Sequence, residues 1–182
     1  KLLAISEIKE NKLMERVHPC LVQRDSYIAK INGVLNAIIV DGYPIGRSVL
    51  QGEGAGPGAT SSALISDLCT ILRGNVRHPF GVSRKHRKKI AKFNISNHIC
   101  SSYLRIEAKD LPGVLSSITK IFSKNKISIK NLIQAPNKKN KKASIAIITH
   151  RNIEKNFNKL LSDLIKNKYV IAKPTFIRIE TI

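Results

Sequence analysis

The sequence has no tryptophan, and aromatic residues make up only 5% of its 182 positions. A stacking platform for nucleotide bases would therefore be thin. No apolar run approaches the roughly 18 residues that a membrane helix requires, and the first apolar segment is too short for a signal peptide. Hydrophobic residues make up 42% and charged residues 24%, which excludes a wholly disordered or collagen-like chain. The length accommodates one large or two small domains.

Cysteine and clustered metal ligands are also scarce. The three cysteines, Cys20, Cys69 and Cys100, are odd in number and far apart, so they indicate neither a disulfide framework nor a zinc site. The five histidines do not stand at metal-ligand spacing either, and we predict no metal site. Isolated, reduced thiols are typical of a cytoplasmic protein.

Acidic residues are scarce in only one part of the chain. Residues 1–72 carry seven basic and seven acidic side chains, whereas residues 73–182 carry 25 basic and five acidic ones, which accounts for the net charge of +20. A nucleic-acid partner is one interpretation. A solvated lysine-rich surface is the other, and we favour it because many lysines fall on predicted helix surfaces and turns. The basic run within 73–99 predicts a linker, which separates an N-terminal segment, 1–72, from a C-terminal domain, 100–182.

The N-terminal segment predicts an α/β arrangement with antiparallel strands. Residues 34–40 are β-branched and apolar and predict a strand, which the turn signal Asp41-Gly42 joins to a second strand over 45–50. Upstream, residues 1–8 are apolar and predict a helix, and residues 17–22 predict a short extended piece.

A glycine-rich loop, residues 52–58, follows the second of these strands. It leads into a predicted helix over 59–72, and three hydroxyl side chains are available to cap that helix, namely Thr60, Ser61 and Ser62. Such a loop could present backbone N–H groups to a phosphate or a carbonyl. It is not a Walker loop, because no Gly-Lys-Ser/Thr follows, and Pro57 stands where the dinucleotide fingerprint needs its third glycine. The alternative is a flexible connection into the helix.

The C-terminal domain has a regular pattern. The predicted order is a strand over 102–108, a helix over 114–123, strands over 127–134 and 143–149 with a hairpin tip at 137–140, a helix over 153–167, and a last strand over 169–179. This β-α-β-β-α-β order is the ferredoxin-like pattern. Apolar residues at helical spacing predict the inward faces of the two helices, Val114, Leu115, Ile118, Ile121 and Phe122 in the first and Phe157, Leu160, Leu161, Leu164 and Ile165 in the second. The helices would cover one face of the sheet and leave the other for a partner.

Residues 49–68, VLQGEGAGPGATSSALISDL, resemble the end of the catalytic region of the homoserine dehydrogenase family, with its G-x-G-A-G loop, Thr/Ala/Ser-rich residues, aliphatic pair and Asp. Two upstream pieces agree in order and spacing. Residues 17–22 resemble the family's V-x-P-T-L-I stretch, with Cys20 in place of the usual Thr, and residues 32–38 resemble its G-V-x-N-A segment. The C-terminal domain resembles an ACT domain in three pieces, Leu104-Arg105-Ile106 leading to Asp110-Leu111-Pro112-Gly113-Val114-Leu115, then Ile127-Ser128-Ile129, and Gln134.

The resemblance implies an α+β protein that is the C-terminal part of an NAD- or NADP-dependent oxidoreductase, which interconverts L-homoserine and L-aspartate 4-semialdehyde. It implies that the main chain of the loop, at Gly52, Gly54, Ala55 and Gly56, approaches the cofactor. Lys1 precedes an aliphatic run as the family's proton-donating lysine does, although an ordinary lysine at a helix start is the alternative. Nothing in the chain resembles the family's Rossmann domain, so we expect a fragment that is inactive alone.

The ACT resemblance implies a regulatory amino acid, by family threonine, bound where two copies meet in a homodimer or homotetramer. The turn that would hold it consists of Asp110, Leu111, Pro112, Gly113 and Val114, and the partner copy's strand around Asn131, Leu132 and Ile133 would close the site. The alternative is a structural dimer in which Asp110 only caps the helix. Two rival functions stay open, a stand-alone amino-acid-sensing ACT protein and a basic nucleic-acid-binding module.

Overall fold

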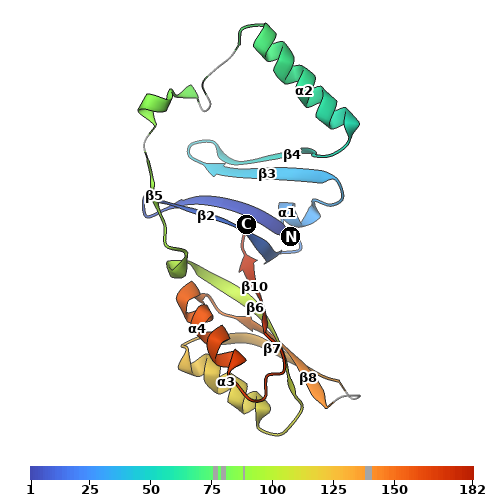
Figure 1. The fold of residues 1–182 in the computed structure, drawn as a ribbon, viewed down its shortest axis with the longest axis vertical. Helices are drawn as coiled ribbons and strands as arrows, with labels where there is room; N and C mark the ends of the chain where they lie inside the picture. Colours follow the sequence, from blue (N-terminus) through green and yellow to red (C-terminus); the bar gives the residue numbers. More distant parts are fainter. Residues whose placement is uncertain (76–77, 79–80, 88, 138–140) are drawn as a thin grey trace. The chain divides into compact units, whose positions relative to one another are not determined.

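The structure, a computed structural model, describes all residues except 76–77, 79–80, 88 and 138–140. Contacts divide the chain into two compact units. Unit 1 consists of Lys1–Gln23 together with Ile90–Ile182, and unit 2 consists of Arg24–Lys89 (Figure 1). Each unit is described by itself. Among the described residues, no helix is long and apolar enough to cross a membrane.

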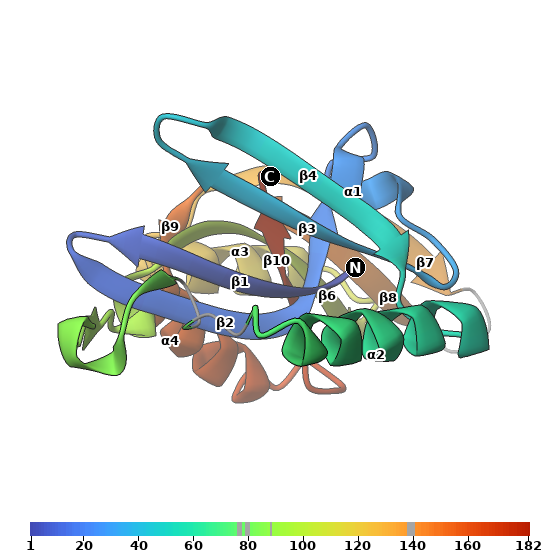
Figure 2. The ribbon, with the colours of Figure 1, turned by 90° about the horizontal axis from the view of Figure 1, so that it is seen from above.

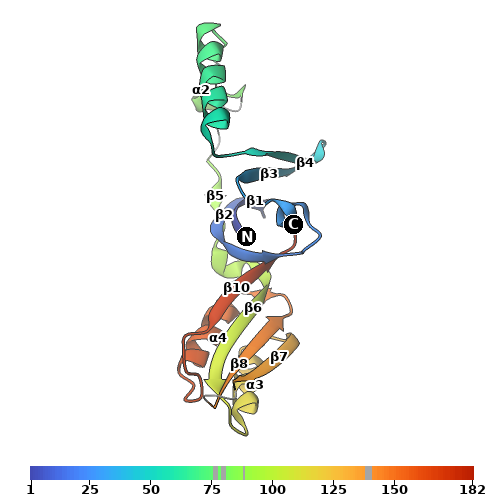
Figure 3. The ribbon, with the colours of Figure 1, turned by 90° about the vertical axis from the view of Figure 1, so that its right-hand side faces the viewer.

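The C-terminal part of unit 1 has the predicted ferredoxin-like fold. Its elements are β6 (Ile99–Lys109), α3 (Val114–Lys124), β7 (Ile129–Asn137), β8 (Lys142–Thr149), the short β9 (Asn152–Ile153), α4 (Glu154–Ile165) and β10 (Thr175–Glu180). The strands lie in the order β10-β6-β8-β7, and each neighbouring pair is antiparallel (Figure 3). The last strand is shorter than predicted, and before it only Val170 forms a bridge, to Ala108. Of the predicted hairpin tip, residues 138–140 lie outside the described residues.

Alternation along the strands builds the core of this fold. Every second residue of β6 and of β8 is buried, and these side chains meet the apolar faces of the two helices. The helix faces are narrower than predicted. Leu115 is 36% exposed and Ile165 is 54% exposed, because Val114, Ile118 and Phe122 already fill the inner side of α3, as the buried residues of α4 do for that helix.

An N-terminal hairpin extends the same sheet. β1 (Leu2–Lys9) and β2 (Lys12–Val22) pair in antiparallel fashion, and Figure 2 shows them side by side. The last three residues of β2 then pair in parallel with β10, while β5 (Ala91–Lys92) pairs with the start of β2. The predicted helix over residues 1–8 is therefore wrong. A hairpin forms instead because Glu10 and Asn11 adopt the left-handed turn, with φ of 52° and 57°, and return the chain along the first strand.

Unit 2 contains α1 (Tyr27–Lys30), the hairpin of β3 (Leu35–Gly42) and β4 (Gly46–Glu53), the long helix α2 (Pro57–Leu72) and the 3₁₀ turn η2 (Arg84–His86). A further 3₁₀ turn, η3 (Ile95–Asn97), belongs to unit 1. The predicted hairpin is present, but its turn consists of residues 43–45 instead of Asp41-Gly42, because Asp41 and Gly42 still belong to β3 and pair with Arg47 and Gly46. No described residue of unit 2 is buried.

Candidate functional site

The glycine-rich loop connects β4 to α2, as predicted from the sequence. The backbone N–H of Gly54 donates to the carbonyl of Val34 at 3.1 Å. A Cβ at Gly54 would lie 1.5 Å from Nδ2 of Asn36, whereas a Cβ at Gly52 would meet nothing within 4 Å. Gly56 has a φ of +110°, a conformation that other residues rarely adopt. The loop is thus anchored at Gly54, whereas the space beside Gly52 is open. Ala55, which follows Gly54, is exposed.

The start of α2 receives no side-chain cap. Its N-cap residue is Gly56, and the hydroxyls of Thr60 and Ser61 donate backwards to carbonyls, that of Thr60 to Gly56 and that of Ser61 to Pro57. The prediction that Thr60, Ser61 or Ser62 caps the helix is therefore wrong, because these hydroxyls lie inside the first turns rather than before them.

Lys1 lies in unit 1, at the start of the N-terminal hairpin. Its carbonyl accepts a hydrogen bond of 2.8 Å from the backbone N–H of Cys20. Lys1 is an exposed residue. The glycine-rich loop belongs to unit 2. The two predicted catalytic elements are therefore described in separate units, each within its own local structure.

The predicted ligand turn leads from β6 into α3. Both the backbone and the side chain of Asp110 are hydrogen-bonded. Its backbone N–H donates to the carbonyl of Lys141 at 2.9 Å, and its Oδ1 accepts from Nε2 of Gln134 at 3.4 Å. The N-cap of α3 is Gly113, with a φ of +85° and no side-chain hydrogen bond. Asp110 therefore does not cap the helix. Leu111 is 50% exposed and Pro112 is exposed, whereas Val114 is buried in the core.

The strand predicted to close the ligand site is β7, at the edge of the sheet. Asn131 and Ile133 lie on the face away from the helices, and Ile133 is 69% exposed. Leu132 points the other way and packs against the core of its own chain. Strand alternation leaves only Asn131 and Ile133 available to another molecule.

Sequence reasoning missed a buried polar cluster where β2, β6, β10 and α4 meet. Arg16 donates from Nε and Nη2 to the two carboxylate oxygens of Glu180 at 3.3 and 3.0 Å, and both side chains are 9% exposed. Nε2 of His18 lies 3.4 Å from Oε1 of Glu180. Burial, reinforced by the Glu180 charge, raises the pKa of the neighbouring Cys20 thiol.

A second ion pair lies beside it. Arg178 donates to both oxygens of Glu154, whose side chain is only 4% exposed. Burial and the Glu154 charge raise the pKa of Cys100 to about 11. His98 is also buried, and its ring nitrogens have no hydrogen-bond partner among the described residues. Burial, and then the charge of Arg16, lower the pKa of His98.

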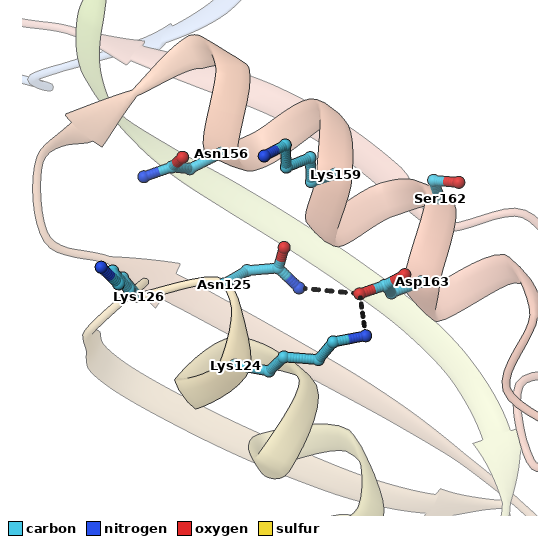
Figure 4. A pocket seen from close by; sticks show the side chains of 7 residues that line it. All are labelled: Lys124, Asn125, Lys126, Asn156, Lys159, Ser162 and Asp163. Atoms are coloured by element: carbon cyan, nitrogen blue, oxygen red, sulfur yellow. Dashed lines mark hydrogen bonds and ion pairs between the residues drawn. The ribbon is translucent and has the colours of Figure 1, made fainter.

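A hollow of about 510 Å³ lies between the end of α3 and α4 (Figure 4). Its lining consists of Lys124, Asn125, Lys126, Asn156, Lys159, Ser162 and Asp163. Asn125 and Lys124 both donate to Oδ2 of Asp163, at 3.1 and 3.2 Å, and these two bonds, that of Asn125 foremost, lower the pKa of its carboxyl group. None of the residues predicted from the sequence lines this hollow. Among the described residues there is also no group of three His, Cys, Asp or Glu that could hold a metal ion.

Comparisons with known proteins cover both parts of the chain. The family model for homoserine dehydrogenase matches residues 1–69, and the model for the ACT domain matches residues 102–168. Homoserine dehydrogenase from Helicobacter pylori is 33% identical over 181 residues, and that from Pseudomonas aeruginosa is 32% identical over 189 residues. Each alignment includes 99% of this chain but only 42% and 43%, respectively, of the relative.

The solved structures give the same result. A homoserine dehydrogenase from Thiobacillus denitrificans matches 100% of this chain with a TM-score of 0.84 and 31% identity, and the match covers 42% of that chain. This chain therefore spans about two-fifths of the length of the relatives it matches. Since both family models match in this order and the whole chain aligns with these relatives, the chain belongs to the homoserine dehydrogenase family and carries an ACT domain.

Proposed function

We propose that this chain is the C-terminal part of an NAD- or NADP-dependent homoserine dehydrogenase, with the end of the catalytic domain in 1–72, a basic linker in 73–99 and an ACT regulatory domain in 100–182. The observation that carries the proposal is the family match over residues 1–69. This range includes all of β4, the glycine-rich loop and most of α2. The reaction is the interconversion of L-homoserine and L-aspartate 4-semialdehyde, a step toward threonine, methionine and isoleucine. The free cysteines suit a cytoplasmic enzyme.

Lys1 is the proposed proton donor. Reduction of the aldehyde builds negative charge on its oxygen, and an ammonium group placed there stabilises that charge and then gives up a proton. The cofactor, when bound, supplies the hydride. The contribution of this chain is to hold the Lys1 backbone against β2 through the Cys20 hydrogen bond, so that the side chain leaves the strand from a fixed point.

The loop residues Gly52, Gly54, Ala55 and Gly56 are the proposed cofactor contacts. They fit such a role because the whole loop is exposed and the missing Cβ of Gly52 leaves open space through which a flat ring can approach the main chain. Gly54 serves the loop differently, since Asn36 occupies the space that its side chain would need. We therefore assign approach to the cofactor to Gly52 first.

Activity measurements test this assignment. An active homoserine dehydrogenase that contains this chain is expected to reduce NAD or NADP only when homoserine is present. The purified 182-residue chain is expected to show no such activity, because it has no dinucleotide fingerprint. Homoserine-dependent reduction of NAD or NADP by the chain alone would contradict the expected inactivity of this chain.

For the ACT domain we propose a small amino acid, threonine by family, bound between two copies in a homodimer or homotetramer. The ligand's carboxylate would meet the N–H groups at the start of α3, and its ammonium group would meet Asp110. Leu111, Pro112 and Gly113 are exposed around that point, and Val114 anchors the turn in the core.

The partner copy would close this site with the same strand that we predicted. Within the group Asn131, Leu132 and Ile133, the outward residues Asn131 and Ile133 make the contact. Calorimetric titration of the dimeric chain with threonine, isoleucine and methionine tests the proposal. We expect heat from threonine, and Asp110→Asn should abolish it. Absence of heat at millimolar threonine in a folded dimer would leave only a structural role.

A further inference from the structure

Asn36 lies on β3 beside the glycine-rich loop. In the antiparallel hairpin it stands directly opposite Gly52, and Gly54 follows at the diagonal position on the same face. A Cβ at Gly54 would lie 1.5 Å from Nδ2, 2.7 Å from Cγ and 3.6 Å from Cβ of Asn36. The carboxamide of Asn36 therefore covers the main chain of the loop at Gly54, and Oδ1 is the atom of this side chain that lies farthest from that position.

The hydrogen-bonding groups of the Asn36 side chain are available to a ligand. The residue is exposed, and within the part of the chain that the structure describes its carboxamide neither donates nor accepts a hydrogen bond. A carboxamide offers two N–H donors and an acceptor oxygen. The other large side chains on this face of the hairpin are apolar and exposed, namely Ile38, Val40 and Leu50. Asn36 is thus the polar side chain of this face that lies closest to the loop.

The open space beside Gly52 brings a ligand to the residue opposite Asn36. A Cβ at Gly52 would meet nothing within 4 Å, so a flat ring can approach the main chain there. Side chains at directly opposite positions of an antiparallel pair begin only about 4.5–5.5 Å apart. A polar group attached to such a ring therefore comes within hydrogen-bonding reach of the Asn36 carboxamide. The nicotinamide ring of NAD and NADP carries a group of this kind, a carboxamide with its own donor and acceptor.

We propose that Asn36 is a cofactor-binding residue, whose carboxamide forms two hydrogen bonds with the carboxamide of the nicotinamide ring. Nδ2 donates to the carbonyl oxygen of the cofactor, and Oδ1 accepts from its N–H group. The proposal rests on the proposed function, in which the loop contacts NAD or NADP at Gly52. It also gives a reason for the glycine at position 54, because any side chain there would displace the Asn36 carboxamide.

The test is calorimetric binding of the reduced cofactor, without homoserine, to an active homoserine dehydrogenase that contains this chain. The second probe is the 3-acetylpyridine analogue of the same cofactor, in which a methyl group replaces the amino group of the carboxamide. The unchanged enzyme should bind the cofactor about tenfold more tightly than the analogue, because the analogue leaves Oδ1 of Asn36 without its donor. In Asn36→Ala this preference should shrink to about twofold, since the acceptor is then absent for both ligands.

Gln51→Ala is the matched control. Gln51 pairs with Ala37, so its exposed carboxamide stands next to Gly52 in the sequence but on the opposite face of the hairpin. This variant should keep the preference of the unchanged enzyme. Asn36→Asp is a second, more conservative variant, because a carboxylate accepts hydrogen bonds but does not donate them. It should bind both ligands more weakly and still prefer the cofactor over the analogue.

An equal loss of affinity for both ligands in Asn36→Ala would mean that Asn36 acts only on the shape of the loop, and it would overturn the proposal, as would an unchanged affinity for both. Cofactor binding to Gly52→Ala distinguishes this failure from failure of the proposed function. Weaker binding in Gly52→Ala with an unchanged preference in Asn36→Ala would remove the role of Asn36 and keep the contact at the loop. Unchanged binding in both variants would contradict both proposals.

Discussion

The two units differ most in what they bury. Unit 1 encloses a continuous core that includes Leu104, Ile147 and Phe157, all with no exposed surface. Unit 2 has no buried residue among those described, although its helix and hairpin are rich in apolar side chains. The exposed ones in α2 are Leu64, Ile65, Leu68, Ile71 and Leu72, and those in the hairpin strands are Ile38, Val40, Val49 and Leu50.

This difference indicates that different interactions stabilise the secondary structure of the two units. Unit 1 holds its elements through packing, so its stability comes from area removed from water. Unit 2 holds its hairpin through backbone pairing and a salt bridge between exposed side chains, Asp41 and Arg47. The proposed cofactor loop therefore belongs to the unit with no core of its own, and the proposed ligand turn belongs to the unit that has one.

Separating the units should have the largest effect. We join residues 1–23 to residues 90–182 by a Gly/Ser linker that spans the length of β2, in place of residues 24–89. This chain should fold cooperatively, because every residue of the core lies outside the replaced segment. A peptide of residues 24–89 should remain unfolded, since an isolated two-stranded hairpin is at best marginally stable. Dispersion of amide signals in NMR spectra measures both. A well-dispersed spectrum of the 24–89 peptide would remove the contrast.

The ion pairs of the two units offer a matched comparison. Arg178→Met in unit 1 leaves Glu154 buried without its partner, and we expect it to cost roughly 3 kcal/mol in the free energy of unfolding. Arg47→Met in unit 2 breaks a pair whose side chains are 46% and 58% exposed, so it should cause no measurable loss. Urea unfolding of both variants checks this. Similar costs would mean that burial does not distinguish the two pairs.

The two glycines of the proposed cofactor loop should respond differently to alanine. Gly54→Ala places a Cβ against Asn36, so it should shift the amide signals of Val34 and Asn36 and weaken the hydrogen bond between Gly54 and Val34. Gly52→Ala should leave these NMR signals unchanged. In an active enzyme, however, it should raise the KM for the cofactor about tenfold, the loss of one good contact of ~1.4 kcal/mol. Normal cofactor binding in Gly52→Ala would show that the loop only connects β4 to α2.

The last expected effect is a pH dependence that arises from a buried thiol of unit 1 and is absent at neutral pH. The pKa of Cys100 is raised from 9.0 to about 11, so the folded state holds this proton more tightly than the unfolded state does. The resulting stabilisation is complete below pH 9 and is lost as the pH rises through about 11. The melting temperature of unit 1 should therefore fall over this range, and it should fall less in Cys100→Ala. An identical slope in the two proteins would contradict the raised pKa.

Much of unit 1 could be predicted from the sequence, because its strands alternate strictly and its helices have clear apolar stripes. Leu104 and Ile106 point inward as expected, and so do Phe122 and Phe157. The first eight residues were misassigned because a short apolar run fits a strand as well as a helix, and its pairing with β2 decides between them.

The Arg16–Glu180 contact could not be predicted, because it joins residues 164 positions apart through a parallel pairing that no local pattern encodes. One signal was present in the composition. Residues 73–182 contain only five acids, Glu107, Asp110, Glu154, Asp163 and Glu180. Each accepts a hydrogen bond from another side chain. In a strongly basic segment, the few carboxylates that remain mark the positions where a specific partner lies.

The most direct test of the proposed function is the kinetics of Lys1→Ala in an active homoserine dehydrogenase that contains this chain, with Lys30→Ala in unit 2 as the matched control. If the Lys1 ammonium donates the proton, kcat should fall by roughly 10²–10⁴-fold, while the KM for homoserine stays within a fewfold. The control should keep both constants. An unchanged kcat in Lys1→Ala, or a defect confined to KM, would contradict the proposed role of Lys1.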